Sequence, residues 1–195
     1  MRILRAAEYR SMPWKNGGGV TTEIAVSPSG AGLDDFDWRV SMARVELSGP
    51  FSQFAGIDRT LAVLEGEGIV LEIASHQPTS INRTTDLFSF PADVQTSAAL
   101  IGGPITDLNV MTRRSRMTHS VERLVISAPV EIRTEAGTTL ILCLDGDVSV
   151  PAAEPVRLGP LDTLLSGPVS TGLLVQPAHE ATLFVIRIGS VAGND

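Results

Sequence analysis

The sequence predicts an all-β protein with two small β-barrels in one chain. Three observations favour this fold class. Gly and Pro turn residues recur throughout the 195 residues, short segments alternate between polar and apolar side chains, and no long window has apolar residues at a helical spacing. A chain of this length is long enough to bury one large core or two smaller ones.

The composition disfavours some classes of partner. The net charge is −7, and the only basic run is the short cluster Arg113, Arg114 and Arg116, whereas a nucleic-acid-binding surface needs an extended basic patch. The single cysteine cannot form an internal disulfide, and no apolar run reaches the length of a membrane span. We therefore expect no nucleic acid partner, no membrane partner and a cytoplasmic location.

The first motif is a glycine loop near the N-terminus. A short strand-like segment at residues 2–4 is followed by Trp14, Lys15 and Asn16, and then by three glycines at 17–19. Consecutive glycines permit positive φ and the close approach of another group. A bare Gly triplet is more often a flexible connector, but Trp, Lys and Asn are not typical of a linker. A phosphate-binding loop is disfavoured, because the Lys precedes the glycines and a strand follows them.

Three predicted strands carry polar side chains on one face. Side chains alternate along a strand, so in the strand at 20–26 Thr21 shares a face with Glu23. In the strand at 38–43, Arg39 shares a face with Ser41, opposite Trp38, Val40 and Met42. The strand at 107–113 has one face made of Asp107, Asn109, Met111 and Arg113. Solvent-exposed faces are the simpler interpretation, but repeated rows of this kind suggest the interior of a small barrel with a wet mouth.

A weak internal repeat predicts the domain organisation. An apolar run, a Gly-bearing hairpin and a second apolar run occupy residues 60–73, and the same design recurs at 139–150. We therefore expect two similar barrels, at residues 1–118 and 119–195. The late strand at 181–188 is apolar on both faces, as in a filled core. Any functional site is accordingly expected in the first barrel.

This outline is typical of a cupin barrel, a jelly roll of the RmlC type. Many cupins hold a divalent metal through two His separated by one residue, a Glu and a distant His. This chain has only His76, His119 and His179, with no pair at that spacing. We expect all three to be surface histidines, with no bound metal and no other cofactor. Metal-dependent dioxygenase or isomerase chemistry is therefore disfavoured.

The sequence offers no recognisable nucleophile with a base. Cys143 lies in the middle of an apolar strand with no cation next to it in sequence, so we interpret it as a buried apolar residue. Ser41 and Ser52 have no paired His at a recognisable elbow. We therefore assign no catalytic residue.

The remaining polar residues form a candidate recognition set. Arg side chains bind carboxylates through two parallel hydrogen bonds, and Asn or glycine-loop N–H groups can bind amide or formyl oxygens. The alternative is a structural network, with Asp58–Arg59 and Asp107–Arg113 as candidate pairs, because buried charges must be paired in either case. The set comprises Lys15, Asn16, Glu23, Arg39, Ser41, Asp58, Arg59, Asp107, Asn109 and Arg113.

Three segments of the first half resemble, in order and spacing, the HutD/Ves family: PWKNGGGVTTEI, FDWRVSMARVELSGPFSQFAGIDRTLAVLEGEG and DLNVMTRR. The resemblance implies a metal-free bicupin with no established enzymatic activity. It implies a binding or regulatory role in bacterial histidine degradation, with urocanate or a formylated or formiminated glutamate as ligand; Ves members are associated with stress responses. It implies pocket residues at Trp14, Lys15, Asn16, Glu23, Arg39, Ser41, Asp58, Arg59, Asp107, Asn109 and Arg113.

Three classes of function remain open. We favour a protein that binds a small carboxylate metabolite, with Arg39 and Arg59 facing the anion and the loop at 15–19 covering the mouth. The second is a metal-free lyase, isomerase or hydrolase with Glu23 or Asp107 as general base, because desolvation inside a barrel raises a carboxylate pKa. The third is a protein-interaction module of the Ves type whose polar rows are structural ion pairs. A homodimer also stays open.

Overall fold

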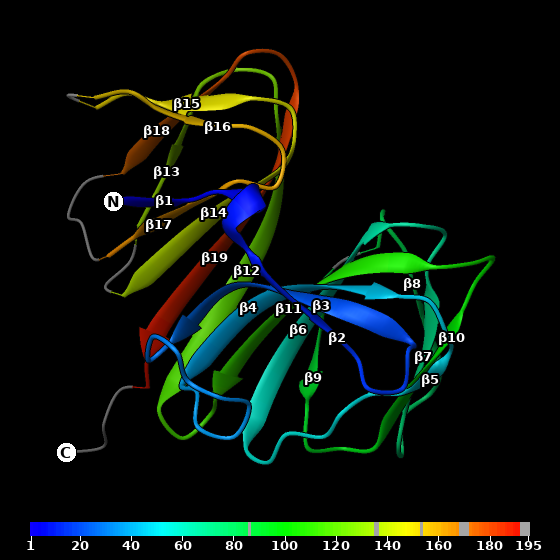
Figure 1. Cartoon of the computed structure of the whole chain (residues 1–195). Coiled ribbons are helices and arrows are strands. Elements are labelled where there is room, and N and C mark those ends of the chain that lie inside the picture. The colour runs from blue at the N-terminus through cyan, green and yellow to red at the C-terminus, as the bar shows by residue number, and fades with distance from the viewer. Residues whose placement is uncertain (86, 135–136, 153, 168–171, 192–195) are drawn as a thin grey trace. The chain divides into compact units, whose positions relative to one another are not determined.

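The computed structural model describes residues 1–85, 87–134, 137–152, 154–167 and 172–191 (Figure 1). Within these ranges the regular structure consists of β-strands and one short 3₁₀ helix, η1 (Ala6–Glu8). The predicted all-β class is therefore confirmed. None of the helical structure in the described ranges is long and apolar enough to cross a membrane.

The chain divides into two compact units. The first unit is Arg10–Met117, and the second unit is Met1–Tyr9 together with Thr118–Asp195. Residues 1–9 are predicted to lie in the first barrel, whereas in the structure β1 (Arg2–Leu4) pairs antiparallel with β17 (Thr163–Ser166) of the second unit. The N-terminal strand thus completes a sheet whose other strands come from the far end of the chain.

The first unit contains two antiparallel sheets that enclose an apolar core. Leu61, Val63 and Leu71 are among its buried residues. The four-stranded sheet has the order β5 (Gly49–Pro50), β10 (Thr96–Leu100), β7 (Ile69–Ile73) and β8 (Thr79–Ile81). The six-stranded sheet has the order β2 (Arg10–Pro13), β3 (Gly19–Ser27), β4 (Trp38–Val45), β11 (Ile105–Arg113), β6 (Ile57–Glu65) and β9 (Phe88–Pro91).

The register of the six-stranded sheet gathers the polar rows on one face. β11 lies between β4 and β6 (Figure 1). Asn109 of β11 lies opposite Ser41 of β4, and Met111 lies between Arg39 of β4 and Arg59 of β6. Directly opposed residues of neighbouring strands point to the same side of a sheet. The alternation predicted from the sequence therefore converges on one surface, which faces the core.

The second unit repeats the two-sheet arrangement. Its core contains Ile141, Cys143, Leu183 and Val185, all fully buried. The five-stranded sheet has the order β1, β17, β14 (Thr138–Asp145), β19 (Ala181–Ser190) and β12 (Met117–Ile126). The four-stranded sheet has the order β13 (Val130–Ile132), β18 (Leu173–Pro177), β15 (Val148–Val150) and β16 (Val156–Leu158).

One glycine in each unit shows how the two halves correspond. Gly66 follows β6 with φ +90°, and Gly146 follows β14 with φ +77°. A Cβ on Gly66 would lie 2.6 Å from the Pro104 carbonyl oxygen, and one on Gly146 would lie 2.7 Å from the Glu180 carbonyl oxygen. Both turns therefore need glycine, for the same positive φ and the same close approach to the residue before the next long strand.

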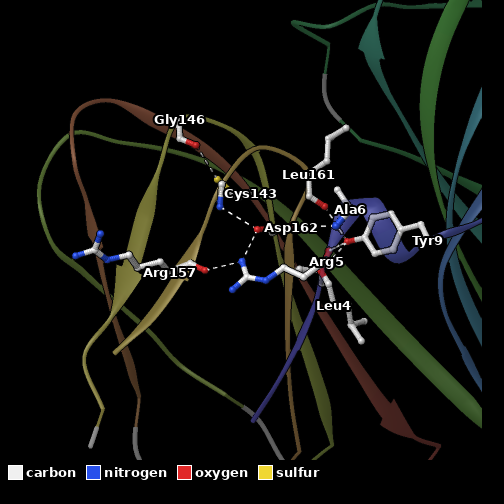
Figure 2. A network of polar contacts seen from close by, with 11 residues as sticks. Leu4, Arg5, Ala6, Tyr9, Cys143, Gly146, Arg157, Leu161 and Asp162 are labelled. Atoms are coloured by element: carbon white, nitrogen blue, oxygen red, sulfur yellow. Dashed lines mark hydrogen bonds and ion pairs between the residues drawn. The ribbon is translucent and has the colours of Figure 1, made fainter. Parts of the chain in front are cut away.

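The N-terminal segment is anchored to the second unit through Asp162 (Figure 2). Its carboxylate accepts hydrogen bonds from Arg5 Nη1 at 2.6 Å and from the backbone N–H of Ala6 at 3.0 Å. Burial raises the pKa of Asp162, but these donors and the Gly159 N–H outweigh it and hold the pKa below its ordinary value. Tyr9 extends the anchor, with its hydroxyl 2.7 Å from the Leu161 carbonyl oxygen.

Candidate functional site

Arg59 is the central feature of the polar face, which we define as Glu23, Arg39, Ser41, Arg59, Asp107 and Asn109. Its side chain is buried, with 4% of the residue exposed. The guanidinium carbon lies 5.1 Å from the ring centre of Phe51, 5.5 Å from that of Phe54 and 5.8 Å from that of Phe90. Three phenyl rings thus hold one guanidinium group in place.

The Nε–H of Arg59 is buried and has no hydrogen-bond partner among the described residues. Aromatic rings stabilise a cation, but they do not replace the strong acceptor that a buried N–H requires. Burial lowers the pKa of Arg59 to about 10, against the opposing effect of Asp107, so the group stays charged at neutral pH. A fixed, charged guanidinium whose Nε–H lacks an acceptor in the described part of the chain is suited to binding a carboxylate.

Asp107 supplies a second carboxyl group on the polar face. Only 1% of the residue is exposed, and its Oδ1 accepts a hydrogen bond of 2.6 Å from Asn109 Nδ2. Burial raises the pKa of Asp107 to about 7, although Arg59, Asn109 and the Ala43 backbone favour the charged form. Both protonation states of this carboxyl are therefore populated near neutral pH.

Arg39 and Glu23 form the second charged pair of the polar face. Arg39 Nε donates to Glu23 Oε2 at 2.8 Å, and both side chains are largely buried. The register shifts between Glu23 and Ala25 on β3, a bulge that re-aims side chains locally. Ser41 is buried in the row between Glu23 and Asn109. Arg39 is therefore partly neutralised by its own partner, whereas Arg59 is not hydrogen-bonded in this way.

The glycine loop is a tight turn between β2 and β3. Asn16 Oδ1 accepts a hydrogen bond of 3.0 Å from the Gly18 N–H, and Trp14 Nε1 donates to Thr21 Oγ1 at 2.8 Å. A Cβ on Gly19 would collide with the Arg44 carbonyl oxygen, so glycine is required there. Trp14 is half-buried beside the strand that carries Glu23, whereas Asn16 and Lys15 are exposed at the turn.

Two predicted site residues, Asp58 and Arg113, have other partners. Asp58 lies on the opposite face of β6 from Arg59, and its Oδ1 accepts a hydrogen bond of 2.9 Å from Arg114. Arg113 donates to the backbone carbonyls of Phe36 at 3.1 Å and Asp34 at 3.0 Å. The candidate pairs Asp58–Arg59 and Asp107–Arg113 are replaced by Asp58–Arg114 and Asp107–Asn109. Arg113 and Arg114 therefore hold surface segments in position.

The three phenylalanines around Arg59 were not predicted as site residues. Phe90 lies directly opposite Arg59 on β9, and Phe51 and Phe54 lie between β5 and β6. The available signal was two aromatic residues shortly before an Arg on a strand, but the contact depends on how a loop folds back over the sheet.

The histidines and the cysteine are not part of the polar face. His76 and His179 are exposed, and His119 is half-buried on β12. Among the described residues, no group of three or more His, Cys, Asp or Glu could hold a metal ion. Cys143 is fully buried in the second unit, as predicted. Burial, with a smaller contribution from nearby carboxylates, raises the pKa of its thiol to about 12, so it is not a reactive thiolate.

Comparisons with known proteins all point to the same family. The sequence model of the HutD family matches residues 6–183. An uncharacterised 21.2 kDa protein of the hutC 3′ region in Pseudomonas putida is 39% identical over 166 residues, which is 84% of this chain and 85% of that protein. Protein Ves of Citrobacter koseri is 38% identical over 113 residues, which is 56% of this chain and 58% of that protein.

Solved structures agree with the sequence comparison. HutD from Pseudomonas fluorescens, in a structure described as a formate condition, aligns over 98% of this chain and 99% of its own with a TM-score of 0.81 and 31% identity. A cupin barrel protein from Leptotrichia buccalis aligns over 95% of this chain and 100% of its own with a TM-score of 0.60 and 10% identity. At that identity the second match shows the fold alone, which is the expected cupin type.

Proposed function

The chain belongs to the HutD family, with the bicupin fold predicted for it, and on this premise we propose that it binds a small carboxylate in the first unit and serves histidine degradation as an accessory or regulatory protein. The observation that carries the proposal is Arg59. Its guanidinium is buried and fixed by three phenyl rings, and its Nε–H has no acceptor among the described residues.

The groups around Arg59 suit a ligand with a carboxylate and a second polar group. A carboxylate would accept hydrogen bonds from Arg59. Asn109 and Ser41 lie in one row next to it, and they offer an amide and a hydroxyl, which can bind a formyl, formimino or imidazole group. Urocanate and the formylated or formiminated glutamates combine these features. We propose one of these as the ligand and the cytoplasm as the place of action.

Asp107 favours a second candidate function, a metal-free enzyme. A general base works best when its pKa lies near the working pH, and the pKa of this buried carboxyl is raised to about 7. Glu23 is the weaker candidate, because Arg39 occupies it at 2.8 Å. Turnover of a pathway intermediate by purified protein, lost in Asp107→Asn, would support this alternative.

Thermal unfolding with each candidate compound tests the proposal. A ligand at a hundred times its Kd adds about 2.7 kcal/mol, and for a chain of this size each kcal/mol raises Tm by roughly 2–4 °C. We expect a rise with urocanate, formylglutamate or formiminoglutamate, and none with the same compound in Arg59→Met. Arg44→Met is the matched control, because Arg44 is exposed and contacts Glu65 only at 4.0 Å.

The result decides between the classes of function. A shift with one compound that Arg59→Met abolishes and Arg44→Met retains would support the binding proposal. The absence of a shift with every compound would contradict it and would favour the interaction module, in which the polar face is a structural network.

A further inference from the structure

We propose that the polar face binds its anion together with one proton, which is taken up by Asp107. This inference rests on the proposed anion binding and adds its regulation by pH. It would make occupancy of the site depend on the acidity of the surroundings as well as on the concentration of the ligand.

The polar face carries both positive and negative side chains. Four groups on neighbouring strands contribute: Arg59 on β6, Arg39 on β4, Glu23 on β3 and Asp107 on β11. Arg39 and Glu23 neutralise each other at 2.8 Å. What remains is one cation, Arg59, and one carboxyl, Asp107. With Asp107 ionised, the free site is therefore electrically neutral.

An entering anion adds a second negative charge to the face that carries Arg59 and Asp107, which lie on neighbouring strands but form no direct ion pair. Asp107 and Arg59 are both almost completely buried, so solvent screens neither of them well. Two carboxylates that share one site raise each other's affinity for a proton. A ligand carboxylate hydrogen-bonded to Arg59 would neutralise it, which would weaken the stabilising effect of Arg59 on the charged form of Asp107. Protonation of Asp107 restores neutrality.

The hydrogen bonds of Asp107 are compatible with the neutral form. Asn109 Nδ2 holds Oδ1 at 2.6 Å, so the proton is expected on the other oxygen, Oδ2. A neutral carboxyl then gains an O–H donor that the ionised form lacks. The same step that removes the repulsion thus creates a hydrogen-bond donor for the ligand.

The expected pH dependence follows from linkage. Below about pH 6 Asp107 is already protonated in the free protein, so binding takes up no proton and Kd is independent of pH. Above the pKa of about 7 in the free protein, each pH unit raises Kd up to tenfold. This continues until the pH exceeds the higher pKa of the complex.

Titration calorimetry in two buffers measures the number of protons taken up when the ligand binds. Formylglutamate is the probe, because its carboxylates stay ionised above pH 6, so any proton must come to the protein. At pH 8 the binding heat is compared in phosphate and in Tris, whose ionisation enthalpies differ. We expect close to one proton taken up at pH 8, close to none at pH 5.5, and a Kd that rises about tenfold from pH 7.5 to 8.5.

Two variants test whether Asp107 is the group that takes up the proton. Asp107→Asn keeps the shape and is expected to show no uptake and a Kd that does not change with pH. Asp58→Asn is the matched control, since Asp58 is next to Arg59 in sequence but pairs with Arg114 on the other face; its uptake should equal that of the wild type. If Asp107→Asn does not fold, the two-buffer comparison on the wild type still decides whether binding takes up a proton.

The outcomes separate the two proposals. Binding with equal heats in both buffers at pH 8 would overturn the proton uptake and leave the anion site standing. Uptake that persists in a folded Asp107→Asn protein would overturn the assignment to Asp107. The absence of binding by any candidate compound at any pH would overturn both.

Discussion

Asp107 and Asn109 in the first unit occupy the ladder positions that Leu183 and Val185 occupy in the second. The correspondence follows from Gly66 and Gly146, which make the same turn against the residue before β11 and β19. The strand registers support this correspondence. Arg59 lies opposite Met111 in the first unit, and Thr139 lies opposite Arg187 at the equivalent position of the second unit. One scaffold thus carries buried charges beside the apolar core of one unit and apolar side chains at the equivalent positions of the other.

The difference shows which residues the fold itself requires. The second unit reaches a fully buried core with Leu183, Val185 and Ile141, so the scaffold forms without interior charges. Each buried charge costs desolvation free energy that its partner only partly offsets. The charges of the first unit are therefore best explained by a requirement other than stability, which is the basis of the binding proposal. Exchanging residues between the two interiors tests this comparison.

The largest effect is expected from Leu183→Asp, which places the carboxyl of the first unit in the apolar interior of the second. Arg59 has no equivalent there, because Thr139 occupies its position. An unpaired buried charge destabilises by about 3–5 kcal/mol, and loss of the leucine packing adds to this. We expect the variant to be unfolded or to lose at least 4 kcal/mol, as measured by urea unfolding at pH 7.

Leu183→Asn is the matched control for Leu183→Asp. It has nearly the same shape as the aspartate but no charge, so it should be clearly less destabilising at pH 7. Equal destabilisation by the two substitutions would show that charge is not what distinguishes the interiors.

The reverse exchange, Arg59→Met with Asp107→Leu, makes the first interior apolar. Replacement of buried charged groups by well-packed apolar residues of similar volume is often neutral or stabilises by about 1–4 kcal/mol. We expect the free energy of unfolding to stay the same or rise, and calorimetry to show at least a hundredfold weaker anion binding, since loss of a buried charge partner costs about 2–5 kcal/mol. A variant that unfolds would show that the polar face is structural.

Much of this contrast could be predicted from the sequence, because strand alternation is local. The period of two placed Arg39 with Ser41 and Asp107 with Asn109, and the structure confirms both faces. The same rule, applied to consecutive residues, would have excluded Asp58 from the face of Arg59. The apolar late strand correctly indicated a filled second interior.

What could not be predicted depends on contacts between distant segments. The pairing of β1 with β17 joins residues some 160 positions apart, and no periodicity encodes that partner. The phenyl rings around Arg59 come from a loop and an edge strand, whose approach is set by packing. Arg113 follows the alternation of β11, but at the strand end it turns to the carbonyls of Asp34 and Phe36.

A third test uses the stability of Asp107→Asn as a function of pH. Burial raises the pKa of Asp107 to about 7 in the folded protein, against about 3.9 in the unfolded chain. Its contribution to the free energy of unfolding is therefore fully present below about pH 4 and lost as the pH rises to about 7. The loss is up to about 4 kcal/mol.

The asparagine variant does not undergo this loss. Relative to wild type, it should gain stability from pH 4 to pH 8, as measured by urea unfolding across that range. Other carboxylates titrate equally in both proteins, so the difference isolates Asp107. A constant difference between the two proteins would contradict a buried carboxyl with a raised pKa.

The smallest expected effect concerns a polar network in the second unit, where hydrogen bonds serve the fold. The Tyr9 hydroxyl lies 2.7 Å from the Leu161 carbonyl oxygen and 2.8 Å from Thr163 Oγ1, and burial raises its pKa to about 12, so it stays a donor at neutral pH. Tyr9→Phe leaves these two oxygens without that partner and should cost about 1–2 kcal/mol.

Anion binding distinguishes this network from the polar face of the first unit. Tyr9→Phe should lower Tm by a few degrees and leave the Kd for the anion unchanged, because the network holds only the N-terminal segment against β17. The double exchange of Arg59→Met with Asp107→Leu should show the opposite pattern, a lost Kd with little loss of Tm. If Tyr9→Phe weakened binding as much as Arg59→Met, the division into an apolar structural interior and a charged binding interior would be wrong.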